Sequence, residues 1–444
     1  MTGAAHLAAL AERRTLLESQ LTTTRSRTFG VTDALSDHDL HHQFNPLMSP
    51  IVWDMGHVGN FEEYWLLRKV EGLAAHDAAF DQMYDPFDNP RYERGDLPIM
   101  QRDEATIYMR NVRGEALDAL RRQDLDPENR LIAGGYVWSM IAQHEAQHQE
   151  TVLQALDLRS DLAPYVAASS RRLPTSTGAV DDTAKVPVPG GPFIVGTDDT
   201  EYAYDNERPA HQVTIEAFAI DKYPVTVRRY AEFIEAGGYQ RDDYWTEEGR
   251  AWLSEYGHTA PQGWIPDLSG GWLVRRFGHV AALDPAEPVE HVNFHEAQAF
   301  ARFAGARLPT EIEWEKAAAW DPQTKRTRKF PWGDTPPAVS QANLGLIGWG
   351  PAPVGSYPRG ASAYGVEQLL GDGYEWTTSR FFGHPGFSVF PYPEYSEVFF
   401  GGDYRVLRGA SWATSVPVAR NTFRNWDHPT RRQIFAGIRL VWDV

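Results

Sequence analysis

The apolar positions of the first 160 residues repeat at helical spacing, and Gly and Pro are sparse there outside two loop regions. At the N-terminus this pattern is carried by Leu7, Leu10, Leu17 and Leu21. A second helix is predicted over Ile51–Val70, with Ser49 as its capping residue and Pro50 at its first position. Two more are predicted after Asp103 and over Gly135–Leu158. Four main helices with modest connections predict an antiparallel bundle in residues 1–162.

The pattern changes after the predicted bundle. Residues 163–189 are rich in Ala, Ser, Thr, Pro and Asp and have no helical period, which is typical of a linker. From residue 190 onward, Gly, Trp, Tyr and Pro are frequent, and short apolar runs alternate with turns. A helix is predicted over His295–Gly305, and a capping box at Thr310–Glu313 predicts another. The sequence therefore predicts a multidomain protein of class α and α+β, whose loop-rich α+β domain covers residues 190–444.

Composition and charge exclude several functions. The formal net charge is -18 at pH 7, which argues against nucleic acid and anionic membranes as main partners. No run of about 18 apolar residues occurs, and charges at Glu12, Arg13 and Arg14 interrupt the N-terminal Ala/Leu stretch. We therefore expect no membrane span, no signal peptide and a cytoplasmic protein. The chain has no cysteine, which excludes disulfide scaffolds, thiolate metal sites and a cysteine nucleophile.

Two histidines four residues apart are the most informative chemical feature. On a helix they share one face, in a stripe without charged residues made of Val137, Ile141, His144, His148, Thr151 and Ala155. Imidazoles among aliphatic and small side chains need polar partners, because burying them without partners is unfavourable. A shared metal ion would satisfy both rings. Two separate core hydrogen bonds, or a solvated edge, are the alternatives that this spacing alone leaves open.

A third ligand has to come from another helix. His57 lies in an apolar setting with Trp53, Phe61 and Tyr64, whereas the competing His38, His41 and His42 lie in a polar run. Three imidazoles with open positions suit zinc hydrolases and Fe(II) oxygen chemistry alike, so the type of ligand does not choose the metal.

Two sets of motifs are similar to known families. The segments WDMGHVGNFEEYWLL and HEAQHQE resemble the DinB-like four-helix bundle. The C-terminal part resembles the sulfatase-modifying-factor (FGE-sulfatase) domain, a C-type-lectin-like fold with little regular secondary structure. The matching motifs there are PVPGGPFIVGTDD, ERPAHQVTIEAFAIDKYPVT, ARLPTEIEWEKAA, FPWGD, GDGYEWT, RVLRGASW and AGIRL. The pair in this order resembles the ergothioneine-biosynthesis sulfoxide synthases (EgtB) over nearly the whole chain.

The resemblance implies a non-heme Fe(II) enzyme that uses O2 as co-substrate. Such an enzyme joins the sulfur of a thiol, γ-glutamylcysteine, to the imidazole C2 of hercynine and oxidises the sulfur to a sulfoxide. By the same resemblance the iron ligands are His57, His144 and His148. Formylglycine generators need protein cysteines, so the C-terminal domain of this cysteine-free chain cannot have that activity.

The resemblance also assigns substrate-binding residues. Arg91 and Arg94 would bind the carboxylates of γ-glutamylcysteine, and Asp427 its α-ammonium group. Gln147, Asn425 and Trp426 are the candidates for hercynine, whose trimethylammonium group requires aromatic faces. From the sequence alone, without the family resemblance, the two arginines would be interpreted as solvated loop residues and Gln147 as an exposed helix residue.

A catalytic tyrosine is also implied in the segment FPYPEYSEVFF. Tyr392 is the preferred proton donor and Tyr395 the alternative, while simple loop packing is the competing interpretation for each.

Other functions compete with this interpretation. The same chemistry could use cysteine, with hercynine or histidine as its partner, as in ovothiol-type enzymes. A zinc-dependent thiol transferase is known among DinB-like bundles. A lectin-like binding module, in which the histidines hold a structural ion, is the non-enzymatic alternative.

Overall fold

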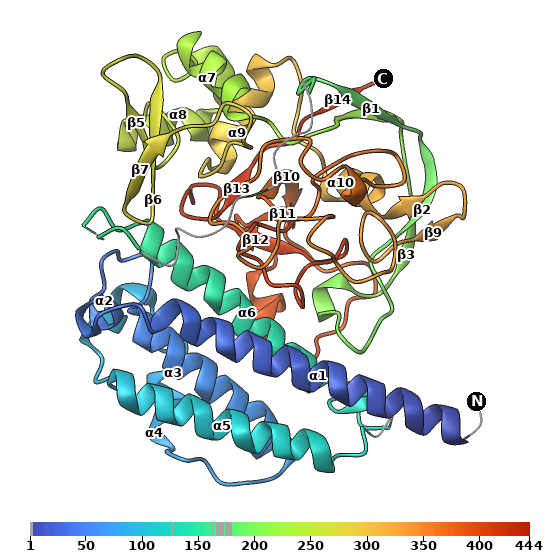
Figure 1. The fold of residues 1–444 in the computed structure, drawn as a ribbon. Coiled ribbons are helices and arrows are strands. Elements are labelled where there is room, and N and C mark those ends of the chain that lie inside the picture. The colour runs from blue at the N-terminus through green and yellow to red at the C-terminus, as the bar shows by residue number, and fades with distance from the viewer. Residues whose placement is uncertain (1–2, 126–127, 162, 166–172, 174–179) are drawn as a thin grey trace. The chain divides into compact units, whose positions relative to one another are not determined.

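A computed structural model describes residues 3–125, 128–161, 163–165, 173 and 180–444 of the chain (Figure 1). The chain forms two compact units. The helical unit comprises residues 1–167 with 199–202, and the loop-rich unit comprises residues 168–198 with 203–444. Within the described ranges, no helix is both long enough and apolar enough to span a bilayer.

Four long helices build the helical unit, where they pack side by side (Figure 1). Buried side chains such as Leu17, Val52, Val112 and Leu153 fill the space between them. The helices are α1 (Gly3–Thr32), α2 (Asp37–His41), α3 (Ile51–Glu62), α4 (Ala79–Met83), α5 (Arg102–Arg122) and α6 (Tyr136–Asp157), with 3-10 turns at Arg91–Asp96 and Ala133–Gly135. The predicted four-helix bundle is confirmed.

The start and the end of the second long helix differ from the prediction. Ser49 is not its cap: the helix begins at Ile51, Pro50 occupies the N-cap position, and no side chain caps it. The Ser49 hydroxyl instead accepts a hydrogen bond from Arg94 at 2.8 Å. After α3 the chain continues into a π-helix, Glu63–Val70, a conformation that occurs often near functional sites.

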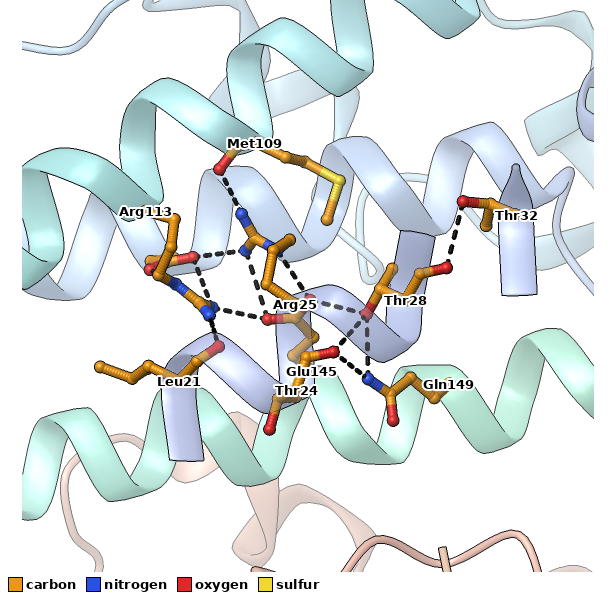
Figure 2. A network of polar contacts seen from close by, with 10 residues as sticks. Leu21, Thr24, Arg25, Thr28, Thr32, Met109, Arg113, Glu145 and Gln149 are labelled. Carbon is orange, nitrogen blue, oxygen red and sulfur yellow. Dashed lines mark hydrogen bonds and ion pairs between the residues drawn. The ribbon is translucent and has the colours of Figure 1, made fainter. Parts of the chain in front are cut away.

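The interior of the bundle contains two buried arginines and two buried glutamates, one from each long helix (Figure 2). Arg25 of α1 and Arg113 of α5 each contact both Glu62 of α3 and Glu145 of α6, with N···O distances of 2.5–2.8 Å. Thr28 adds a hydrogen bond to Glu145 at 2.7 Å. The four formal charges sum to zero, and each buried charge contacts two of opposite sign, which offsets the cost of burying it.

Short strands and loops dominate the loop-rich unit. Its largest sheet has the order β12-β11-β10-β13, and a three-stranded sheet has the order β1-β4-β14. The strands are β1 (Lys185–Val188), β2 (Gly191–Val195), β3 (His211–Ile215), β4 (Phe218–Asp221), β5 (Trp264–Pro266), β6 (Trp272–Arg276), β7 (His279–Ala282), β8 (Trp320–Asp321), β9 (Arg326–Thr327), β10 (Tyr374–Arg380), β11 (Arg405–Gly409), β12 (Asn425–Asp427), β13 (Ala436–Gly437) and β14 (Val441–Asp443). The helices are α7 (Val227–Glu235), α8 (Glu247–Tyr256), α9 (Phe294–Phe303) and α10 (Glu311–Ala319).

Strand β1 corrects the predicted linker at its C-terminal end. Lys185–Val188 pairs antiparallel with Phe218–Asp221 along four residues, so these positions belong to the folded unit. The proline-containing sequence KVPV hid this strand, because proline removes a backbone donor and is confined to edge strands, where β1 lies. Much of the remaining segment 163–184 lies outside the described residues, and the other predicted domain limits stay predictions.

The loop-rich unit has few long elements, and buried ion pairs hold its loops together. Four fully buried arginines each contact a glutamate: Arg408 with Glu315, Arg420 with Glu207, Arg424 with Glu311 and Arg439 with Glu375. Most of these residues lie in the sequence motifs quoted above. Segments that are distant in the sequence are thus paired through these ions. An apolar cluster in the same unit contains Trp314, Phe218, Ile220 and Leu369.

Candidate metal centre

Three histidines of the helical unit converge on one point. His57 comes from α3, and His144 and His148 come from α6. One ring nitrogen of each lies within 4.8 Å of the others, and the Nε2 atoms of His57 and His144 are 3.2 Å apart. Two nitrogens that bind the same ion at about 2.1 Å have a comparable separation when they are neighbouring ligands.

The hydrogen bonds of two rings fix which nitrogen carries the proton. Nδ1 of His57 lies 2.8 Å from the carbonyl oxygen of Tyr84, which can only accept. Nδ1 of His148 lies 2.8 Å from a carboxylate oxygen of Asp54. Both rings therefore carry hydrogen on Nδ1 and present the Nε2 lone pair, which is the arrangement that metal-binding histidines require.

Burial keeps the histidines in the form that a metal needs. His57 and His144 are 8% and 9% exposed, and their pKa values are held well below the usual 6.5, first by burial and then by neighbouring histidines of the site. Both imidazoles are neutral at neutral pH. Aromatic stacking orients them: Trp53 lies parallel to His57 at 5.0 Å, and Phe61 parallel to His144 at 3.8 Å between ring centroids.

The donor set fits a divalent transition metal. With hydrogen on Nδ1 of both rings, the Nε2 lone pairs of His57 and His144, 3.2 Å apart, are placed to bind one cation. Three neutral imidazoles leave further coordination positions open, which suits Fe(II), zinc and related ions. The competing histidines lie elsewhere: His38 and His42 stack on each other at 5.2 Å and are not part of the cluster. Of the candidate third histidines, the structure brings His57 together with His144 and His148.

The two loop arginines differ in their surroundings. Arg94 is buried and donates to the carbonyl oxygens of Asn89 and Pro86 and to Ser49. Its guanidinium lies 3.6 Å from the Trp53 ring centroid, so it supports the ring that stacks on His57. Burial lowers the pKa of Arg94 to about 10, against the opposing effect of the Asp54 charge. Arg91 is exposed and donates to the carbonyl oxygen of Leu47.

Gln147 lies on α6 between the two metal-site histidines. It is half-buried, and its amide donates to the Gln143 carbonyl at 3.3 Å. The remaining predicted site residues, Tyr392, Tyr395, Asn425, Trp426 and Asp427, belong to the loop-rich unit.

The three aromatic candidates of the loop-rich unit, Tyr392, Tyr395 and Trp426, lie in one aromatic cluster. Tyr395 stacks on Tyr204 at 4.0 Å and meets Trp426 edge-on at 5.5 Å, and Tyr392 meets Tyr395 edge-on at 6.4 Å. Trp426 also stacks on Phe381 at 4.1 Å. Burial raises the pKa of Tyr395 well above its usual value, and the neighbouring tyrosines act in the same direction.

Strand β12 carries the other two candidates beside Trp426. The Asn425 side chain accepts from the backbone N–H of Trp426, and Asp427 accepts from that of His428 at 2.7 Å. Arg424, which directly precedes the strand, donates to Glu311 of α10 and so anchors the start of β12.

Several residues that support these sites were missed by sequence reasoning. Asp54 has a detectable signal, because it precedes His57 by three residues and so shares its helix face. Tyr84 contributes a backbone carbonyl, which no side-chain pattern reveals. Asp205 holds the loop of Tyr392 by accepting hydrogen bonds from the Phe390 N–H and the Ser396 hydroxyl. It lies 185 residues before Phe390, so no local sequence pattern connects it with this loop.

Comparisons with known proteins cover nearly the whole chain. The Sulfatase-modifying factor enzyme 1-like domain matches residues 165–444, and the DinB superfamily matches residues 20–152. A hercynine oxygenase of Mycolicibacterium thermoresistibile is 48% identical over 441 residues, which are 97% of this chain and 95% of that protein. A hercynine oxygenase of Mycobacterium tuberculosis is 48% identical over 96% of this chain and 99% of its own length. The formylglycine-generating enzyme of Bos taurus is 33% identical over 44% of this chain and 58% of its own.

Proposed function

Because the chain belongs to the hercynine oxygenase family and is an oxygenase, we propose that it is the sulfoxide synthase of ergothioneine biosynthesis. It joins the imidazole C2 of hercynine to the sulfur of γ-glutamylcysteine with O2 as oxidant. The C2–H and S–H bonds break, a C–S bond and an S=O bond form, and the second oxygen atom leaves as water. The substrates lose four electrons, which O2 accepts.

The observation that carries the proposal is the convergence of one ring nitrogen from each of three histidines, in a chain so similar to hercynine oxygenases. We assign Fe(II) to this point, held by His57, His144 and His148. Bound there, Fe(II) would supply the redox chemistry that activates O2 and a coordination position for a thiolate. Three neutral ligands place no compensating charge on the ion, so an anionic thiolate is a favourable additional ligand.

The thiol substrate is assigned from charge complementarity. γ-Glutamylcysteine carries two carboxylates and an α-ammonium group, for which Arg91, Arg94 and Asp427 are suitable partners. Among the described residues, Arg94 donates three hydrogen bonds from its five N–H groups, which leaves two for a carboxylate. Arg91 is the more accessible of the pair.

Hercynine is assigned to the aromatic cluster and its polar neighbours. A trimethylammonium group has no N–H donor, so the face of Trp426 is a suitable contact. Asn425 is the candidate for the hercynine carboxylate, and Gln147 for the imidazole. Since both the thiol substrate and Fe(II) need a reducing compartment, the proposed location is the cytoplasm.

The deciding experiment incubates purified chain with hercynine, γ-glutamylcysteine, Fe(II) and air, and identifies the product by mass spectrometry. The sulfoxide conjugate should appear with equimolar O2 uptake, and γ-glutamylcysteine should outcompete cysteine when both are present. Anaerobically prepared protein should bind one Fe(II) per chain.

The variant His57→Ala is the matched control, and it should lose both bound iron and turnover. A preference for cysteine, or for histidine over hercynine, would contradict the assigned substrates. Activity with Zn(II) and no O2 uptake would contradict the oxygenase assignment and favour a thiol transferase.

A further inference from the structure

Asp54 is an acidic residue inside the helical unit with an unusual lack of partners. Its side chain is 3% exposed and lies on the same face of α3 as His57. Of its two carboxylate oxygens, Oδ1 contacts Nδ1 of His148 at 2.8 Å. Among the residues that the structure describes, Oδ2 is buried without a hydrogen-bond partner. Among the described residues, the one hydrogen bond of this carboxylate thus comes from Nδ1–H of His148, which lies on another helix.

The surroundings of Asp54 make this hydrogen bond energetically important. Asp54 is 3% exposed, and the cavity beside the Asp54–His148 pair is lined by Val31, Met55, Val58 and Val152 together with polar side chains such as Thr28, Thr32 and Gln149. A carboxylate in such a setting carries a desolvation penalty, and an asparagine or alanine would avoid it. Low polarity also strengthens the hydrogen bond that is made.

The Nδ1 atoms of the three histidines differ in their hydrogen-bond partners. Nδ1 of His57 donates to a neutral backbone carbonyl, and Nδ1 of His144 is buried without a partner in the described part of the chain. Only the ring of His148 has an anionic acceptor among these three. An anionic acceptor fixes the tautomer and the ring orientation, and it increases the basicity of the opposite nitrogen.

We infer that Asp54 is the positioning residue of the metal centre, because its carboxylate holds His148 with Nδ1 protonated and Nε2 directed at the ion. This inference rests on the proposed metal site. It makes His148 the strongest of the three ligands and places one negative charge directly behind it. Asp54 itself does not touch metal or substrate.

The test measures anaerobic Co(II) binding to the full chain by its visible absorption, with Asp54→Asn, Asp54→Ala and a control. Asp54→Asn keeps the shape and removes the charge, whereas Asp54→Ala removes the acceptor. Both should bind Co(II) about 10–100-fold more weakly, as is usual when such a partner is lost. The control Asp81→Asn removes a carboxylate of the same unit that pairs with Arg68, and it should bind as the wild type does.

A second measurement separates positioning from general damage. Nitrogen-15 spectra of histidine-labelled apo chain should show His148 protonated on Nδ1 in the wild type, with this preference lost in Asp54→Ala. Wild-type affinity and tautomer in both Asp54 variants would overturn the inference while leaving the metal site intact. Failure of the wild type itself to bind Co(II) would instead contradict the proposed function, and the inference with it.

Discussion

At the scale of single residues, the two tyrosines of the segment FPYPEYS have different surroundings. The Tyr395 ring lies between Tyr204 and Trp426, and its raised pKa makes it a weaker proton donor. Tyr392 has an edge-on contact with Tyr395, and the chain leading to it is held by Asp205. These contacts favour a packing role for Tyr395 and leave Tyr392 as the preferred donor.

We therefore expect Tyr392→Phe to change the product and Tyr395→Phe to preserve it. Loss of the phenol proton should slow C–S bond formation and favour direct oxidation of the thiol by O2 to a sulfinate. O2 uptake should continue, because only the fate of the thiol changes. Chromatography of both products for each variant measures the ratio. If Tyr395→Phe alone shifts the ratio toward sulfinate, the roles of the two tyrosines are exchanged.

At the scale of helices, the buried quartet and the metal centre share α3 and α6. Glu145 follows His144 directly, and its carboxylate is held by guanidinium groups from α1 and α5 (Figure 2). Through Glu62 the same arginines hold α3, which carries His57. The quartet therefore fixes the rotation of both histidine-bearing helices, because a helix turned about its axis would leave charges buried without partners.

Removing one member of the quartet should be strongly destabilising. We expect Glu145→Gln to lower the free energy of unfolding by about 3–5 kcal/mol, since it leaves a buried arginine charge uncompensated. The control Asp118→Asn removes an exposed partner of Arg121 and should change stability by less than about 1 kcal/mol. Urea unfolding followed by far-ultraviolet ellipticity compares the variants. Equal midpoints for Glu145→Gln and the control would contradict a structural role for the quartet.

The pH dependence of the wild type follows from the same carboxylate. Burial alone would raise the pKa of Glu145, but Arg25 and Arg113 lower it to about 2. Because this pKa is depressed in the folded chain, the stabilisation is complete above about pH 4.5 and is lost as the pH falls toward 2.

At the scale of the whole molecule, the two units are stabilised by different means. Long amphipathic helices and the quartet stabilise the helical unit, whereas buried Arg–Glu pairs connect the short strands and loops of the other. The three metal-site histidines all belong to the helical unit. Metal binding should consequently stabilise that unit directly.

This location predicts a regional effect of metal on hydrogen exchange. At a free concentration one hundred times the Kd, bound metal adds about 2.7 kcal/mol to the stability of the state that binds it. Anaerobic Fe(II) should therefore slow exchange by up to about 100-fold in α3 and α6, and leave β10 and β11 largely unchanged. A chelator should reverse the effect, and His57→Ala should abolish it. Slowing confined to β10 and β11 would contradict the assigned metal site.

Much of this architecture is determined by the sequence alone. Helical periodicity specifies the bundle, since apolar residues must share a face to be buried. The i,i+4 spacing of His144 and His148 depends only on helix geometry, and the capping box at Thr310 and Glu313 is equally local. The absence of cysteine excludes formylglycine-generating chemistry without reference to any fold.

Tertiary structure decided what depends on contacts between distant segments. The distance between His57 and His144, 87 residues apart in the chain, is set by helix packing rather than by local pattern. The tautomer of His57 depends on the backbone carbonyl of Tyr84, which lies outside α3. The tautomer of His148, on α6, depends on the side chain of Asp54, which lies on α3. The charged residues of the quartet resemble solvated surface residues in sequence, because charge pairing becomes visible only when four helices meet. Local interactions thus determine the elements, whereas the protonation and orientation of the site are properties of their packing.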